Sequence, residues 1–298
     1  MTGLSGLPRG GLRGVCLAVA CLLAACPLRG GLGGLEAVAF NRLSDPNVSA
    51  LGERALAINA DGWLHAETEN FIYHYFNSFI ATPVSVEAEF YYRVIAGDLG
   101  RETAAWERKS HIYIFESDAD WAAFQRNASL EPWTGGIHAG GELFIQRNPK
   151  YKYKGATLGH EVVHLVLDRF LAGRLPLWLE EGYAEFASSI SYASFMRARG
   201  YRAKPSARAV DPGSFIPLRE LFGMRRYPAT GARIRAFYDQ SHRLVRFLRQ
   251  RDKQAFLGFL ERMAAGSRVD SALKTYYPAL HDDFEAFSNQ FHAYATGA

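Results

Sequence analysis

His160-Glu161-Val162-Val163-His164 is the most informative stretch of this chain. On a helix, residues four apart lie one above the other on the same face, so His160 and His164 can reach one metal ion together. Glu161 lies one step round the helix and can lean toward a water molecule on that ion. This H-E-x-x-H pattern is typical of a zinc-binding helix whose glutamate acts as a general base. The alternative is a helix that carries two histidines by chance.

Two consecutive helices are predicted around this motif. The first runs from about Thr157 to Leu171, and Gly173 and Pro176 prevent its continuation. The second begins at once and carries three acidic residues in an otherwise apolar sequence, with no Lys or Arg before Ser194. A solvated face would mix in basic residues, so burial around a cation is the better interpretation. The acidic residues are Glu180, Glu181 and Glu185.

A catalytic zinc site needs a third protein ligand. A metzincin would have Gly at position 167 and His at 170, but this chain has Leu167 and Phe170, which excludes that class. Asp168 is roughly 12 Å from His160 along a helix axis, so we expect it to form a salt bridge or to support a ligand from outside the site. A glutamate from the second helix remains, as in His₂Glu zinc sites.

The segment Trp178-Leu179-Glu180-Glu181-Gly182-Tyr183-Ala184 after the H-E-x-x-H motif resembles the gluzincin metallopeptidases. In the aminopeptidase branch the motif runs W-L-x-E-G-x-A, and the glutamate before the glycine is the third zinc ligand. The resemblance therefore implies Glu181, rather than Glu180, as the ligand beside His160 and His164. The 16 residues between His164 and Glu181 are similar to the shorter loop of bacterial peptidase-MA-like proteins. The resemblance is specific over residues 157–187 and coarse elsewhere.

The same resemblance implies roles for residues around the zinc. Glu185 stands where the thermolysin-like branch has an acidic residue that hydrogen-bonds a zinc histidine. Tyr238 lies 57 residues after Glu181, near the spacing of the tyrosine that stabilises the oxyanion in the aminopeptidase-like branch. His242, four residues further on the same helix face, is the alternative for that role. His138, in a glycine-rich stretch, is expected to be a polar loop residue, although it could line a cleft.

The expected activity is zinc-dependent hydrolysis of peptide bonds, with Glu161 as general base. The resemblance implies that the strand at 142–145 is the edge along which an extended peptide lies. Gly140-Gly141-Glu142-Leu143-Phe144 does not match the acidic motif that grips a free amino terminus, so we expect an endopeptidase acting on a peptide or protein substrate. The alternatives are a binding or assembly module with structural zinc, or a hydrolase of a cell-wall amide. The presence of Glu161 favours an enzyme.

The N-terminus reads as an export signal. Residues 1–26 have a basic start, an apolar stretch of about a dozen residues and Leu23-Ala24-Ala25-Cys26, which resembles a bacterial lipobox. A lipidated Cys26 would tether the protein to a membrane. Ordinary cleavage after Ala39, or an uncleaved anchor, is the alternative. Each of the three predicts an exported protein of the periplasm or cell envelope.

The chain of 298 residues is 48% hydrophobic and has a net charge of +4. It contains no long run of Lys and Arg, so no nucleic-acid partner is expected. Its three cysteines all lie in residues 1–26, so no disulfide framework is expected in the body. We expect an α+β fold: a small mixed or antiparallel sheet packed on the motif helix, then a helical C-terminal part. The predicted divisions are a linker at 27–60, a zincin-like catalytic domain at 61–195 and a mostly helical subdomain at 196–298 that completes the cleft.

The residue patterns place individual elements within these divisions. Strands are predicted at 69–75, 111–115 and, as one or two strands around a glycine turn, 135–145. Helices are predicted at 83–97, 118–126, 238–251, 253–264 and 282–294, with a short one at 49–58 in the linker. The basic segment after Ser194 is expected to be a surface loop, which could also hold an acidic substrate or membrane headgroups.

Overall fold

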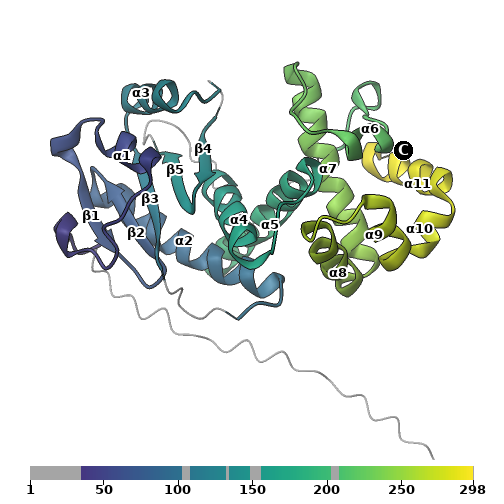
Figure 1. The fold of residues 1–298 in the computed structure, drawn as a ribbon, viewed down its shortest axis with the longest axis horizontal. Coiled ribbons are helices and arrows are strands. Elements are labelled where there is room, and N and C mark those ends of the chain that lie inside the picture. The colour runs from purple at the N-terminus through teal and green to yellow at the C-terminus, as the bar shows by residue number, and fades with distance from the viewer. Residues whose placement is uncertain (1–34, 103–107, 132–133, 148–155, 203–207, 298) are drawn as a thin grey trace, which may run out of the picture. The chain divides into compact units, whose positions relative to one another are not determined.

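The computed structural model describes residues 35–102, 108–131, 134–147, 156–202 and 208–297. The predicted signal segment 1–26, with Cys26, and the start of the predicted linker lie outside these residues. Figure 1 shows a sheet with helices on its two faces and a mainly helical C-terminal region. The α+β fold class is therefore confirmed.

One mixed sheet is built from strands β1 (Leu64–Glu67), β2 (Phe71–Tyr75), β3 (Ser110–Phe115), β4 (Gly136–Ala139) and β5 (Glu142–Gln146). Their order is β1-β2-β3-β5-β4. The inner strands β2, β3 and β5 are parallel, whereas β1 and β4 pair antiparallel at the two edges. Parallel neighbours need long crossover connections, which contain α2 (Ser78–Asp98) and α3 (Asp118–Ala128).

The two faces of the sheet bury different side chains. Ile112 and Ile114 of β3 belong to the core formed with α2 and α4 (Ala156–Phe170). Tyr113 and Phe115 point the other way, into a cluster with α1 (Ala50–Leu56) and α3. Because both faces are covered, every residue of β3 is buried, which explains why its sequence lacks polar alternation.

A tight glycine turn joins β4 to β5. Gly140 and Gly141 have φ of +61° and +79°, values that residues with a side chain adopt only with strain. The predicted glycine turn is confirmed, but the prediction that 142–145 forms the sheet edge is wrong. β5 pairs with β3 on one side and with β4 on the other, so β4 is the edge strand.

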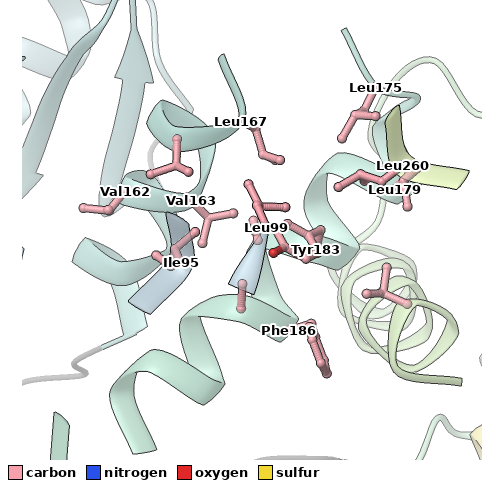
Figure 2. Close-up of a cluster of buried hydrophobic side chains, with 14 of the residues drawn as sticks. Ile95, Leu99, Val162, Val163, Leu167, Leu175, Leu179, Tyr183, Phe186 and Leu260 are labelled. Atoms are coloured by element: carbon pink, nitrogen blue, oxygen red, sulfur yellow. The ribbon is translucent and has the colours of Figure 1, made fainter. Parts of the chain in front are cut away.

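Later helices pack in succession from α4, the helix that carries the H-E-x-x-H motif. α4 packs on α5 (Leu177–Ala198), and α5 packs on α7 (Gly231–Arg251). Figure 2 shows Ile95 of α2, Val163 of α4 and Tyr183 of α5 in one buried cluster. Among the described residues, no helix combines the length and apolarity needed to cross a membrane. The other helices are α6 (Leu218–Gly223), α8 (Lys253–Ala264), α9 (Val269–Tyr276), α10 (Pro278–Asp282), α11 (Phe284–Thr296) and the 3₁₀ turns Phe40–Arg42, Ala60–Gly62 and Pro212–Ser214.

Some elements differ from the sequence prediction. α2 begins five residues before the predicted start, because Asn77 caps it by accepting from the backbone N–H of Phe79, and Pro83 lies inside the helix. α5 continues to Ala198, into the predicted surface loop. β1 was not predicted, since its four residues carry no apolar run. The short helix predicted at 49–58, by contrast, is confirmed as α1, and its Ala55 is fully buried.

Candidate metal centre

Three predicted metal ligands converge on one point. α4 presents His160 and His164 on one face, and α5 brings Glu181 against them. Nε2 of His160 lies 3.2 Å from Oε2 of Glu181, and Nε2 of His164 lies 3.8 Å from the same oxygen. The two Nε2 atoms are 3.1 Å apart. One ligand atom from each residue lies within 4.8 Å of the others, which makes this group a candidate metal site.

Two glycines allow close contacts between the helices around this group. A Cβ atom added to Gly159 of α4 would lie 3.3 Å from Cβ of Ser188 on α5. A Cβ atom added to Gly182, next to Glu181, would lie 2.5 Å from the backbone oxygen of Ser241 on α7. The glycine in the W-L-x-E-G-x-A segment therefore has a packing role between α5 and α7.

Each histidine has a second glutamate on its other ring nitrogen. Nδ1 of His160 lies 3.1 Å from Oε1 of Glu185, and Nδ1 of His164 lies 3.3 Å from Oε1 of Glu180. In a neutral imidazole one nitrogen donates and the other accepts. Donation from both Nδ1 atoms to these carboxylates leaves both Nε2 lone pairs directed at Glu181 and at each other. That tautomer is the one that binds a metal through Nε2.

The chemistry of this arrangement fits a cation. Oε1 of Glu181 accepts a hydrogen bond of 2.5 Å from the hydroxyl of Tyr227. Oε2 of Glu181 is buried, and among the described residues no donor reaches it in hydrogen-bond geometry. A buried carboxylate oxygen without a partner is costly, and two lone pairs facing it add repulsion. Two imidazoles and a carboxylate are a donor set for a divalent transition-metal ion, which would remove both costs.

Glu161 lies beside this point and is only 7% exposed. The backbone N–H of His138 on β4 donates to its carboxylate. β4 passes so close that a Cβ atom on Gly136 would lie 3.1 Å from Cγ of Glu161. Burial raises the pKa of Glu161, although the neighbouring histidines act in the opposite direction. A carboxylate with a raised pKa beside a metal position can accept and return a proton.

Tyr238 of α7 also faces the site. Its ring centroid lies 6.4 Å from that of His160. Burial, with a contribution from Glu181, raises the pKa of Tyr238, so its hydroxyl keeps its proton and can donate. His242 is on the same helix, but it packs against Phe186 at 6.1 Å between ring centroids and interacts electrostatically with Glu185. Of these two predicted oxyanion donors, Tyr238 is the one whose ring contacts a metal-site histidine.

His138 is not in a loop, so that prediction is wrong. It lies in β4, where burial lowers its pKa to about 4. Its Nε2 atom lies 3.9 Å from Oδ2 of Asp168. Asp168 therefore lies outside the metal group, near the C-terminal end of α4. Glu142, in the segment expected to meet a substrate, accepts from Ser49 and Tyr113 on the opposite face of the sheet instead.

Two residues of the site received no individual role from the sequence: Glu180, which was named only as one of the three acidic residues of the second helix, and Tyr227. Glu180 carried a usable signal: two metal histidines need two acceptors for their Nδ1–H groups, and α5 has three acidic residues. Tyr227 had none, because it lies in the irregular segment between α6 and α7.

No protein-family model matches this chain, and no curated protein matches its sequence.

Proposed function

We propose that this chain is a zinc-dependent metallopeptidase, an endopeptidase of the bacterial cell envelope. One observation carries the proposal: Oε2 of Glu181 is buried, no described residue donates to it, and it faces Nε2 of both His160 and His164. The position of Glu161 beside this group supports hydrolysis rather than a purely structural metal. The gluzincin resemblance of residues 157–187 supports zinc and a peptide substrate.

The residues divide the chemistry between them. Zinc, when bound, supplies a Lewis acid that activates a water molecule and polarises a carbonyl group. Glu161 accepts the proton of the water and passes it to the leaving amine. The hydroxyl of Tyr238 donates a hydrogen bond to the oxyanion that develops on the former carbonyl oxygen. Glu185 accepts a hydrogen bond from Nδ1–H of His160, and Glu180 accepts one from Nδ1–H of His164. These bonds keep the two imidazoles in the orientation that directs Nε2 to the metal position.

The free edge of the sheet supports a peptide substrate. Among the described strands β4 pairs only with β5, so its outer side offers backbone groups to an extended chain. The backbone of His138 and Gly136 in this strand lies against Glu161. A peptide paired with β4 would therefore pass the general base. The envelope location rests on residues 1–26, and a lipidated Cys26 would supply the membrane tether.

The test uses the full chain. Bound zinc is measured by mass spectrometry, and cleavage of a mixed peptide library is compared between wild type, Glu161→Gln and the exposed control Glu220→Gln. We expect one zinc ion per chain in all three, with cleavage reduced at least about 10²-fold in Glu161→Gln alone. Metal-free wild type would overturn the proposal. Zinc without cleavage by wild type would favour a binding module or a hydrolase of another amide.

A further inference from the structure

We infer that Tyr227 is a positioning residue that keeps Glu181 a monodentate metal ligand. The inference rests on the metal site of the proposed function and adds a residue that the H-E-x-x-H and W-L-x-E-G-x-A segments do not contain. The hydroxyl of Tyr227 donates to Oε1 of Glu181 across 2.5 Å, while Oε2 faces the two histidines. Oε1 therefore serves as a hydrogen-bond acceptor, and Oε2 is left to bind the metal.

The side chain reaches the site from outside the metal-binding helices. Tyr227 lies between α6 and α7, with the buried Pro228 next to it, and 49% of its surface is exposed. Its ring stacks on Tyr238, with centroids 6.0 Å apart and planes 19° apart, and meets Phe237 edge-on. A half-exposed ring contributes little core burial, so the directed hydroxyl is the feature that needs an explanation.

The hydrogen bond decides how many coordination positions Glu181 can take. A carboxylate binds a metal through one oxygen or through both. A short O–H···O⁻ bond of this length is charge-assisted and strong, so it competes with coordination by Oε1. A catalytic zinc site must keep one position for water or substrate. Because its hydrogen bond keeps Oε1 away from the metal, Tyr227 leaves the coordination position for water or substrate open.

Tyr227 also connects the ligand to Tyr238, because its ring stacks on the ring of Tyr238. A tyrosine hydroxyl has a single proton, and that of Tyr227 is directed to Glu181. Burial and the charge of Glu181 raise the pKa of Tyr227, so it remains a donor at neutral pH.

Cobalt tests the inference, because the visible spectrum of Co²⁺ reports its coordination number. The full chain is loaded with Co²⁺ as wild type, as Tyr227→Phe and as Tyr201→Phe, an exposed tyrosine outside the site. We expect intense four-coordinate bands in wild type and Tyr201→Phe. In Tyr227→Phe we expect weaker, five-coordinate bands, because Oε1 also binds the metal.

Each outcome has a distinct meaning. An unchanged spectrum in Tyr227→Phe overturns the inference and leaves the metal site standing. A wild type that binds no cobalt overturns the metal site and the inference together. The spectra are recorded without substrate, so a metal-loaded protein that cleaves no peptide would overturn the peptidase proposal alone.

Discussion

Nδ1 of His160 lies 3.1 Å from Oε1 of Glu185, one helical turn beyond Glu181 on α5. This contact fixes the imidazole so that Nε2 points at the metal position. Partners of this kind typically contribute about 10–100-fold in metal affinity. Glu185→Gln should therefore weaken zinc binding by about that factor, as measured by competition with a chromophoric chelator. Glu261→Gln, on the exposed side of α8, should bind zinc like wild type, and equal affinity in the two variants would contradict the assigned role.

Gly182 is where we expect a single methyl group to disturb the site's scaffold. In Gly182→Ala the new Cβ atom would meet the backbone oxygen of Ser241 at 2.5 Å, and a backbone atom cannot turn away as a side chain can. Overpacking of this kind costs about 1–3 kcal/mol of unfolding free energy. Urea denaturation measures the change.

Gly97→Ala is the matched control, since no atom of the described part of the chain lies within 4 Å of an added Cβ atom there. Removing a helix glycine without a clash should stabilise the protein by about 0.5–1 kcal/mol. If both variants lose stability equally, the close approach of α5 and α7 is not what requires Gly182.

The candidate metal ligands could be predicted because the interactions that place them are local. The spacing of His160 and His164 fixes a shared helix face, and a short connection brings the next helix beside it. The choice of Glu181 over Glu180 came only from the family resemblance. In the structure both glutamates contact the histidines. Glu181 faces the two Nε2 atoms, and Glu180 faces Nδ1 of His164.

The features that were missed depend on contacts between distant parts of the chain. Tyr227 is one of 15 tyrosines, and nothing in its local sequence distinguishes it. The hairpin of β4 and β5 is evident from Gly140-Gly141, but which of its strands joins β3 depends on the packing of the whole sheet. That choice moved the expected substrate edge from β5 to β4.

Asp98, at the end of α2, joins the sheet region to the C-terminal helices. It accepts from the hydroxyl of Tyr183 at 3.0 Å, pairs with Arg249 of α7 and lies 3.2 Å from Nζ of Lys253 on α8. Asp98→Ala leaves a largely buried guanidinium without its carboxylate, which should cost about 3 kcal/mol of unfolding free energy. Glu220→Ala removes the exposed pair with Arg233 and should cost under about 1 kcal/mol. Similar midpoints in urea for the two variants would refute this difference.

A row of three histidines crosses the other face of the sheet, away from the metal centre. Nδ1 of His65 lies 2.8 Å from Nδ1 of His74, and Nε2 of His74 lies 2.9 Å from Nδ1 of His111. Nε2 of His111 is buried without a partner among the described residues. Burial lowers the pKa of all three, and that of His111 falls to about 4, with Asp45 opposing the shift and Arg108 adding to it.

These histidines should make the protein less stable in mild acid. Above pH 6.5 they are mostly neutral in both the folded and the unfolded chain, so stability does not depend on their protonation. Between pH 6.5 and about 4 the unfolded chain binds protons that the folded chain does not, so the unfolding free energy falls as pH falls. For His111 alone the difference approaches roughly 3 kcal/mol near pH 4. Other groups titrate in the same range, so the measurement compares urea denaturation of wild type, His111→Gln and the control His292→Gln at several pH values. His111→Gln should lose less stability on acidification than the other two, and three parallel pH profiles would show that this histidine row does not govern the response.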